Sequence, residues 1–305
     1  MNSFNINIQP TSNPAILKFE TNQFLTRHES FEFKNIEEAA RSPLAQQLFH
    51  LPFVKTVFIA QNFIAIEKYN IIEWQDIQEE VGEQLKTYLN SGAPVIKSDE
   101  TKAPKLVPVT VYAESTPNPS VMKFVANKKL VISGREFKNI DATGKAPLAR
   151  QLFHFPFVKE VFMDENYISI HKFDIAEWDD ITLELREFIR NYLQEGNEVL
   201  LEETFTEAET QEDKTAHAQV KNENLDDVSR QVVDILDEYI KPAVASDGGN
   251  IVFDSYNADT KTVKVILQGA CSGCPSSTAT LKSGIETMLR DMLEGQVQYV
   301  EAVNG

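Results

Sequence analysis

The residues most able to do chemistry in this chain are Cys271 and Cys274, the only two cysteines among its 305 residues. Their C-x-x-C spacing brings two thiolates close enough to hold one metal centre or to close one small disulfide ring. An iron–sulfur cluster or a tetrathiolate zinc site normally takes four sulfur ligands. If the motif binds such a centre, the remaining ligands come from a second copy of the chain. The cysteine count therefore favours a symmetric dimer or redox chemistry.

The segments on either side of the cysteines predict where the thiolates stand. Apolar residues over 263–267 predict a strand, and Pro275 opens a helix whose apolar positions continue to Met292. A strand, a glycine-containing loop and a helix start place Cys274 at or near a helix N-terminus. Unpaired N–H groups and the positive end of the helix dipole favour a thiolate there. The same geometry suits a redox dithiol, so the spacing alone leaves both chemistries open.

Further elements complete this C-terminal region. Apolar residues at helical spacing predict a helix that starts at Leu225 and ends near Pro242. We expect a tight turn at 247–250, a strand at 251–253 and a last strand at 297–303.

The rest of the chain contains a duplication. Residues 42–69 and 146–173 align without a gap, and 17 of their 28 positions are identical. Each copy predicts an extended segment, a short helix that starts at a proline, two strands joined by a hairpin turn, and a long amphipathic helix. In the first copy these are 16–20, 43–49, 54–59, 63–68 and 74–89; the second copy repeats them from 121–125 and 147–153 to a helix over 178–193. The pattern predicts an α+β protein.

Composition shifts divide the chain into three small domains and two linkers. We expect the first repeat to occupy 1–97 and the second 109–201, with a short proline-containing linker at 98–108. Residues 202–224 are acidic and poor in apolar side chains, which predicts a flexible linker. The cysteine domain then occupies 225–305.

Charge and hydropathy exclude several classes of function. A formal net charge of −17 argues against nucleic acid as a partner, because phosphate binding draws its affinity from clustered Lys and Arg. No apolar run approaches the roughly 20 residues that cross a bilayer. The first eight residues lack the character of a signal or transit peptide. We therefore expect a cytoplasmic protein, where a lone C-x-x-C is more often metal-binding or catalytic than a structural disulfide.

The repeats offer few other candidates for chemistry. His50 and His154 stand at equivalent positions, but neither has a second His or Cys nearby in the sequence, which favours a structural or surface role. The repeated phenylalanines are expected in the core. Neither repeat contains a cysteine, so neither supplies a thiolate.

Longer motifs show a resemblance to a known family. The strings are Asp247-Gly248-Gly249-Asn250, Gly269-Ala270-Cys271-Ser272-Gly273-Cys274-Pro275-Ser276-Ser277 and Thr280-Leu281-Lys282 followed by Gly284-Ile285-Glu286. Together they resemble the C-terminal domain of the NifU-like (Nfu) iron–sulfur scaffold and carrier proteins, over nearly all of 225–305. The repeats resemble the family's separate N-terminal domain, through Thr116-Pro117-Asn118-Pro119 with Lys123-Phe124 and Ser42-Pro43-Leu44-Ala45 with Leu48-Phe49. That domain, usually single, is present twice here.

The resemblance implies a carrier without enzymatic activity or catalytic residues. Cys271 and Cys274 from each of two chains would hold one labile [4Fe-4S] cluster per dimer, with a [2Fe-2S] form as the alternative state. Upstream assembly machinery would donate the cluster and apo iron–sulfur proteins would receive it, with no nucleic acid or membrane partner. Two other functions stay open: a thiol–disulfide oxidoreductase that uses the same cysteine pair, and a structural zinc domain shared across a dimer.

Overall fold

The computed structural model describes residues 3–26, 29–97, 108–201, 226–272 and 275–305. The chain divides into two compact units, of which the first holds the first repeat and the second holds the second repeat together with the C-terminal domain. The predicted linker 202–224 and most of the linker 98–108 lie outside the described residues.

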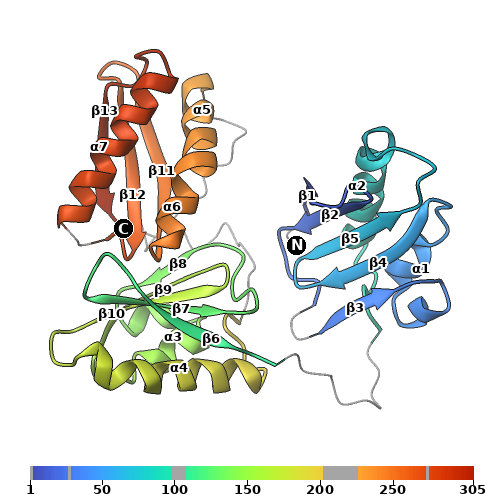
Figure 1. The fold of residues 1–305 in the computed structure, drawn as a ribbon, viewed down its shortest axis with the longest axis horizontal. Helices are drawn as coiled ribbons and strands as arrows, with labels where there is room; N and C mark the ends of the chain where they lie inside the picture. The colour runs from blue at the N-terminus through green and yellow to red at the C-terminus, as the bar shows by residue number, and fades with distance from the viewer. Residues whose placement is uncertain (1–2, 27–28, 98–107, 202–225, 273–274) are drawn as a thin grey trace. The chain divides into compact units, whose positions relative to one another are not determined.

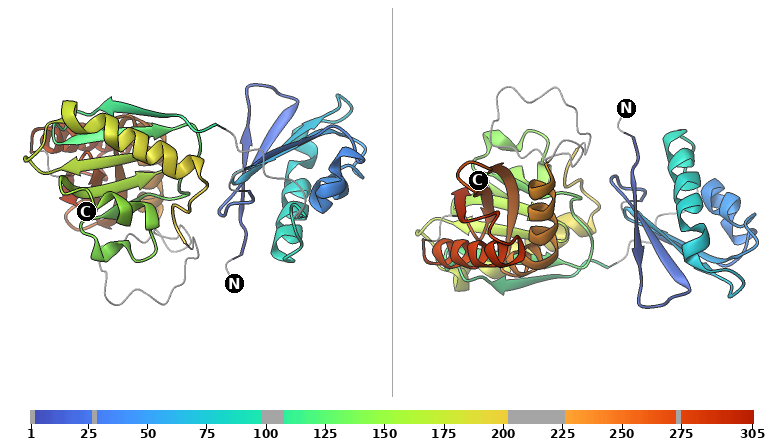
Figure 2. Two further views of the ribbon diagram at one scale, coloured as in Figure 1. Left: turned by 90° about the horizontal axis from the view of Figure 1, so that it is seen from below. Right: turned by 90° about the horizontal axis from the view of Figure 1, so that it is seen from above.

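The first repeat is a five-stranded antiparallel sheet covered on one face by two helices (Figures 1 and 2). The sheet order is β1-β2-β5-β4-β3. Its strands are β1 (Ile6–Pro10), β2 (Ile16–Thr21), β3 (Ser30–Phe33), β4 (Val54–Ala60) and β5 (Phe63–Lys68). Its helices are the 3-10 turn η1 (Glu38–Arg41), the short α1 (Pro43–Leu48) and the long α2 (Trp74–Asn90).

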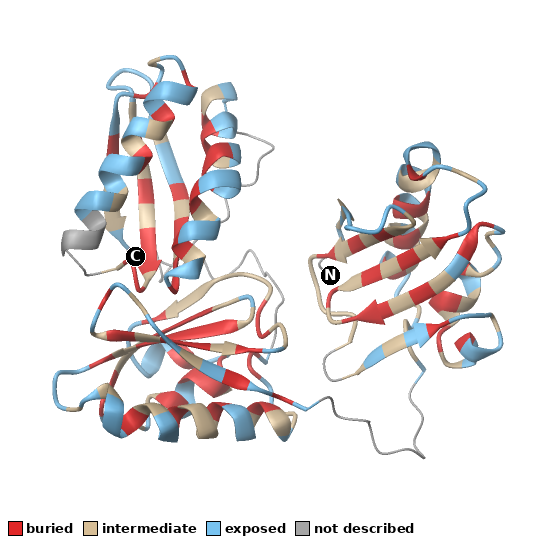
Figure 3. Cartoon of the chain, in the orientation of Figure 1, coloured by how far each residue is buried: buried red, intermediate tan, exposed pale blue. Residues whose placement is uncertain are grey.

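Alternation along the strands decides which face of the sheet meets the helices. In β5, Ile64 and Ile66 are fully buried, while Phe63 and Ala65, which alternate with them, are only half-buried. Since successive side chains of a strand point to opposite faces, the isoleucines pack under α1 and α2 and the other two residues lie on the open face. Figure 3 shows this alternation as red and tan bands along the strands.

The second repeat has the same topology, with sheet order β6-β7-β10-β9-β8. Its elements are β6 (Val111–Ser115), β7 (Val121–Ala126), β8 (Arg135–Phe137), η2 (Asp141–Thr143), α3 (Pro147–Leu152), β9 (Val158–Asp164), β10 (Tyr167–Lys172) and α4 (Trp178–Gln194). Here β10 differs from β5: Tyr167, Ile168, Ser169 and Ile170 are all buried, so both faces of this strand are covered.

The C-terminal domain is a three-stranded sheet of order β11-β12-β13 with helices beside it. Its elements are α5 (Asp227–Ile235), the π-helical turn η4 (Leu236–Ile240), α6 (Lys241–Ser246), β11 (Gly249–Asn257), β12 (Thr262–Gly269), α7 (Pro275–Met292) and β13 (Tyr299–Asn304). Strands β11 and β12 are antiparallel, whereas β12 and β13 are parallel. Parallel neighbours need a crossover, which α7 provides.

The predicted helices and central strands are confirmed, as is the α+β class, but three details were wrong. The strand predicted at 251–253 runs over Gly249–Asn257 and so includes the second half of the predicted turn at 247–250. Asp226 caps the first helix of the C-terminal domain, its Oδ1 accepting the Ser229 N–H at 2.9 Å, so this helix begins at Asp227. The helical path does not end near Pro242 and continues to Ser246. The π turn η4 places Pro242 in the first turn of α6, where its missing N–H breaks no intrahelical bond.

The outer strands of both repeats were not predicted. These are β1, β3, β6 and β8, which are three to five residues long and lie at or next to a sheet edge. Short, partly polar segments carry little periodicity, so the sequence pattern does not separate them from loops. No helix in the described ranges combines the length and the apolar character needed to cross a membrane.

Candidate thiolate site

Cys271 stands in the loop that follows β12, at the point where the strand turns toward α7. Gly269 ends the strand with φ of +60°, a left-handed conformation that favours glycine. The Ala270 N–H then donates to the Gly248 carbonyl at 3.1 Å, and the Ser272 N–H donates to the Gly269 carbonyl at 3.0 Å. The first bond holds the loop against the residue before β11, and the second closes the loop on itself. Only 8% of Cys271 is exposed, and the residue belongs to the core of the C-terminal domain.

The predicted turn at 247–250 packs directly on this cysteine. Gly248 has φ of +80°, and Gly249 begins β11. A Cβ atom at Gly249 would lie 2.6 Å from the Cys271 Sγ, which is closer than real Cβ atoms approach. The glycine therefore makes room for the thiol, and the turn and the cysteine loop form one packed structure.

The second cysteine of the motif, Cys274, lies outside the described residues. Helix α7 begins at the next residue, Pro275, which confirms the predicted helix start. His50 and His154 are both exposed, in keeping with a surface role. No group of three His, Cys, Asp or Glu side chains that could hold a metal ion occurs among the residues that the structure describes.

Two hydroxyl groups of the second repeat bind the turn at 247–250, the glycine turn, which contains Gly248 and Gly249. The Ser169 Oγ donates to the Gly248 carbonyl at 2.6 Å, and the Tyr167 hydroxyl donates to the Gly249 carbonyl at 2.8 Å. Both side chains lie on the face of the second-repeat sheet that α3 and α4 leave open. Tyr167 and Ser169 were not among the predicted site residues, because the identical positions of the two repeats do not include them. The signal was in the unlike positions, where the first repeat has Phe63 and Ala65.

An asparagine of the Thr-Pro-Asn-Pro motif reaches the cysteine loop itself. The Asn118 Nδ2 lies 3.3 Å from the Ala270 carbonyl and 3.5 Å from that of Ser272. Its own Oδ1 accepts the Ser120 N–H at 3.1 Å, which orients the amide. The side chain therefore contacts the carbonyls on both sides of Cys271.

Charged groups of the second repeat complete the surroundings. The Glu136 carboxylate accepts the Gly269 N–H at 3.0 Å. Burial raises the pKa of Glu136, and this hydrogen bond only partly opposes the rise. The Lys123 Nζ donates to the Ser246 carbonyl at 3.2 Å and lies 3.5 Å from Glu114.

Burial, and then the negative charges of Asp164 and Cys271, raise the pKa of Tyr167. The phenol therefore stays protonated and remains a donor to the turn.

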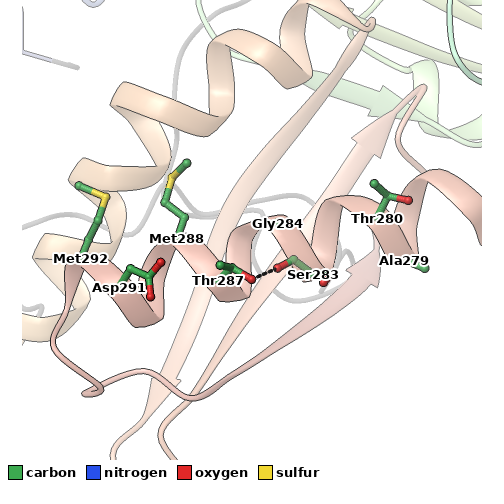
Figure 4. A pocket seen from close by; sticks show the side chains of 8 residues that line it. All are labelled: Ala279, Thr280, Ser283, Gly284, Thr287, Met288, Asp291 and Met292. Carbon is green, nitrogen blue, oxygen red and sulfur yellow. Dashed lines mark hydrogen bonds between the residues drawn. The ribbon is translucent and has the colours of Figure 1, made fainter.

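A hollow on the outer side of α7 carries none of this chemistry (Figure 4). All its lining residues come from the one helix: Ala279, Thr280, Ser283, Gly284, Thr287, Met288, Asp291 and Met292. Asp291 is its one ionisable side chain, and the Thr287 hydroxyl donates back to the Ser283 carbonyl at 2.9 Å. The loop that carries Cys271 is therefore the better candidate site.

Comparison with known proteins identifies a family for both repeats and for the C-terminal region. The family described as "Scaffold protein Nfu/NifU N terminal" matches twice, over 6–92 and 111–196. The NifU-like domain matches residues 232–301.

Curated relatives point the same way. NifU-like protein 5, mitochondrial, of Arabidopsis thaliana is 32% identical over 196 residues, covering 64% of this chain and 66% of its own length. The NFU1 iron-sulfur cluster scaffold homolog, mitochondrial, of Drosophila willistoni is 34% identical over 195 residues, covering 63% of each. The matches thus span less than two thirds of these relatives. A solution structure of a NifU-like protein from Saccharomyces cerevisiae is 32% identical over 32% of this chain and 92% of its own, but its TM-score of 0.30 supports no argument.

The relatives overturn one expectation. Their names assign them to mitochondria, which contradicts the cytoplasmic location expected from the sequence. That expectation used the lack of a long apolar run and the character of the first eight residues, and neither property identifies a compartment. The family assignment has broader support. Two N-terminal matches followed by a NifU-like match account for most of the sequence, and the chain therefore belongs to the Nfu/NifU scaffold protein family.

Proposed function

We propose that the chain is an iron–sulfur cluster scaffold and carrier, in which Cys271 and Cys274 from each of two chains hold one labile [4Fe-4S] cluster. The observation that carries this proposal is the loop between β12 and α7, where Cys271 packs on a glycine turn and the helix begins one residue after Cys274. The name of the Drosophila relative, an iron-sulfur cluster scaffold homolog, supports it. The cluster is the cargo, which the dimer would pass to apo-proteins.

The chemistry follows from the number and placement of the thiols. A cubane cluster takes four thiolates, and each chain supplies two. The positive end of the α7 dipole favours the deprotonated form of a thiol next to it. A cluster shared between two chains loses half its ligands when the chains separate. Such a site suits delivery better than permanent storage.

We further propose that the repeats recognise the recipient proteins. Both repeats display the same exposed apolar position in the loop that leads to their long helix: Ile71 is 68% exposed and Ile175 is 72% exposed. An exposed aromatic residue precedes each of them by two positions, Tyr69 and Phe173. Exposed apolar groups of this kind mark surfaces that contact other proteins. Two equal surfaces on one chain would raise the local concentration of cluster around a bound recipient.

The cluster proposal is tested by anaerobic reconstitution of the full chain with iron and sulfide. We expect the visible absorbance of a cluster, one cluster per two chains by iron analysis, and a dimer in native mass spectrometry. Cys271→Ala and Cys274→Ala should each abolish stable loading. Ser272→Ala, in the same loop, is the control that should still load. A full cluster complement on a monomer would contradict the proposal, as would disulfide exchange catalysed by a protein that loads no cluster.

The recognition proposal is tested with the double variant Ile71→Glu/Ile175→Glu. Transfer of the loaded cluster to an apo-enzyme that regains activity with a [4Fe-4S] cluster should slow several-fold at low protein concentration, while loading stays normal. Leu183→Glu is a matched control, because Leu183 is also exposed and the first repeat already has glutamate, Glu79, at that position. Equal slowing by the control variant would mean that added charge, and not the apolar surface, caused the effect.

A further inference from the structure

The open faces of the two repeat sheets have different chemistry at matching positions. In the first repeat this face of β5 carries Phe63 and Ala65. In the second repeat the equivalent residues of β10 are Tyr167 and Ser169. Each replacement adds one hydroxyl group to the same carbon framework. Both added hydroxyls donate to carbonyls of the glycine turn that packs on Cys271.

Burial on these faces differs in the same way. Phe162 is only 2% exposed, whereas its counterpart Phe58 is half-buried. Asn118 is buried, whereas Asn13, in the same turn of the first repeat, is exposed. The lysine on this face follows the pattern: the Lys18 side chain is 29% exposed and that of Lys123 is 11% exposed. The sheet face that α3 and α4 leave open in the second repeat is therefore covered by the C-terminal domain.

The covering surface is made of glycines at close approach. A Cβ at Gly248 would lie 2.9 Å from the Ser169 Oγ, and a Cβ at Gly269 would lie 2.7 Å from the Phe162 Cδ1. Any larger residue at these two positions would separate the surfaces. Both glycines have positive φ, and the Gly248 carbonyl and the Gly269 amide bond to side chains of the repeat. Shape and hydrogen bonding thus match along this contact.

We propose that the second repeat is a clasp for the cysteine loop of its own chain, and that the first repeat, which lacks both hydroxyls, is not. The occupant of the clasp is the segment 246–250 together with the loop 269–272. Its recognition groups are the carbonyls of Ser246, Gly248 and Gly249 and the amide of Gly269. In this closed arrangement Asn118 lies across the carbonyls that flank Cys271.

The clasp has a consequence for cluster loading. Two chains can share one cluster only when both cysteine loops face each other, and a clasped loop faces the second repeat instead. Opening of the clasp therefore precedes loading. This consequence rests on the proposed function, whereas the clasp itself does not, because it exists in the chain without cargo.

The test of the clasp follows the reactivity of Cys271 in the cargo-free full chain. A Cys274→Ser background leaves one thiol, and its alkylation by iodoacetamide is timed by mass spectrometry. Tyr167→Phe/Ser169→Ala gives the second repeat the residues of the first, and we expect alkylation to speed up about tenfold, the order of change for two lost hydrogen bonds to buried carbonyls. Phe63→Tyr/Ala65→Ser, the reverse exchange in the first repeat, is the control that should leave the rate unchanged.

A second variant and a second readout keep the test decisive. Ser169→Arg places a large side chain where Gly248 now packs, and Ala65→Arg is its matched control. Amide hydrogen exchange of peptides that cover 246–254 and 164–172 should rise together in Ser169→Arg and stay low in Ala65→Arg. Unchanged alkylation and unchanged exchange in both second-repeat variants would overturn the clasp. Protection that depends on protein concentration would also overturn it, because the contact would then join two chains.

The loading experiment separates this inference from the proposed function. If the chain is a cluster carrier, reconstitution of Tyr167→Phe/Ser169→Ala with both cysteines present should be faster than that of the parent chain. Equal loading rates with altered thiol reactivity would refute the gating of loading and leave the clasp in place. A failure of both proteins to load any cluster would refute the carrier function, and the alkylation result would still decide the clasp.

Discussion

The two repeats share one face of their sheet and differ on the other. Under the helices the match is close: Phe19 and Phe124 are both fully buried, and Trp74 and Trp178 each donate an indole N–H to a carbonyl of the turn before the second strand. On the open face, a lysine lies over an aromatic ring in both copies, 5.0 Å from the ring centroid in the first and 4.8 Å in the second. In the second copy, that lysine and the hydroxyl on that ring also bind carbonyls of the C-terminal domain.

Two added hydroxyl groups are enough to turn a solvent-facing sheet into a binding face. The core of a repeat depends on volume and apolar character, which the duplication retains. The open face depends on which side chains can donate a hydrogen bond, and two hydroxyl groups change that. Substitutions in the shared core should therefore act alike in the two repeats, and substitutions on the open face should not.

The largest effect should come from the shared core and should be equal in the two copies. Phe19→Ala and Phe124→Ala each leave a cavity in a fully buried position, which should cost about 3–5 kcal/mol of the free energy of unfolding. Each repeat carries one of the two tryptophans, so denaturant unfolding followed by fluorescence in Trp178→Phe and Trp74→Phe backgrounds reports each repeat separately. A large loss in one repeat alone would show that the two cores are not equivalent.

Matching substitutions on the open faces of the two repeats should cost unequal amounts of unfolding free energy. Phe162→Ala empties a position that packs against Gly269 and should destabilise the second repeat by about 3 kcal/mol, whereas Phe58→Ala, at a half-buried position, should cost about 1 kcal/mol. The same fluorescence assay measures both. Equal losses would mean that contact with the C-terminal domain adds no stability to the second repeat.

The pH dependence contributed by Asp164 should have no counterpart at the same position of the first repeat. Burial is the main cause that raises the pKa of Asp164 to about 6 from 3.8, and the first repeat has Ala60 at this position. Because the folded state holds the proton more tightly than the unfolded state, this carboxyl stabilises the fold below about pH 4, and that contribution is lost as the pH rises through 6.

The stability difference between the parent chain and Asp164→Ala should therefore change with pH in a known direction. Lowering the pH from 7 to 4 should stabilise the parent relative to the variant by on the order of 1–2 kcal/mol, a figure reduced for partial solvent screening. Urea unfolding at several pH values measures this difference. Asp164→Asn, which cannot titrate, should lack the dependence as well. A parent that gains no stability relative to both variants would disprove the assignment.

The smallest effect should come from a helix cap that only one copy has. The Ser42 Oγ accepts the Ala45 N–H at 3.1 Å and donates to the Val95 carbonyl at 2.7 Å, whereas Ala146 gives the second copy no side-chain cap. Ser42→Ala should therefore cost about 1 kcal/mol in urea unfolding of the first repeat. Ala146→Ser is the reciprocal test, and a loss of stability there would show that the second copy has no room for the cap.

Much of the fold could be predicted because the same sequence pattern occurs in both repeats. The helices that start at Pro43 and Pro147, and the hairpins that turn at Gln61 and Glu165 with positive φ, were read from periodicity and turn residues. The continuation past Pro242 could not be predicted, because a π turn is set by packing and leaves no mark in the sequence pattern. The domain boundaries stay a prediction.

Only the part of the site that is formed by residues close together in the sequence could be predicted. The sequence of strand, glycine loop and helix predicted the surroundings of Cys271 because neighbouring residues produce them. The contacts of Tyr167 and Ser169 with the glycine turn join segments 79 and 82 residues apart, and hydrophobic periodicity carries no information at that distance. The assignment of Cys271 and Cys274 as ligands is likewise a proposal that reconstitution has to test.

The outer strands have a consequence for how the chain folds during synthesis. Tandem domains of similar sequence are prone to exchange strands, because a strand from one copy can pair with the sheet of the other. Here the edge strands β1 and β6, with sequences INIQP and VYAES, share no residue at any aligned position. Pro10 also gives β1 one backbone N–H fewer than β6. At this edge of the sheet the two copies are thus unlike, which favours each nascent repeat closing on its own edge.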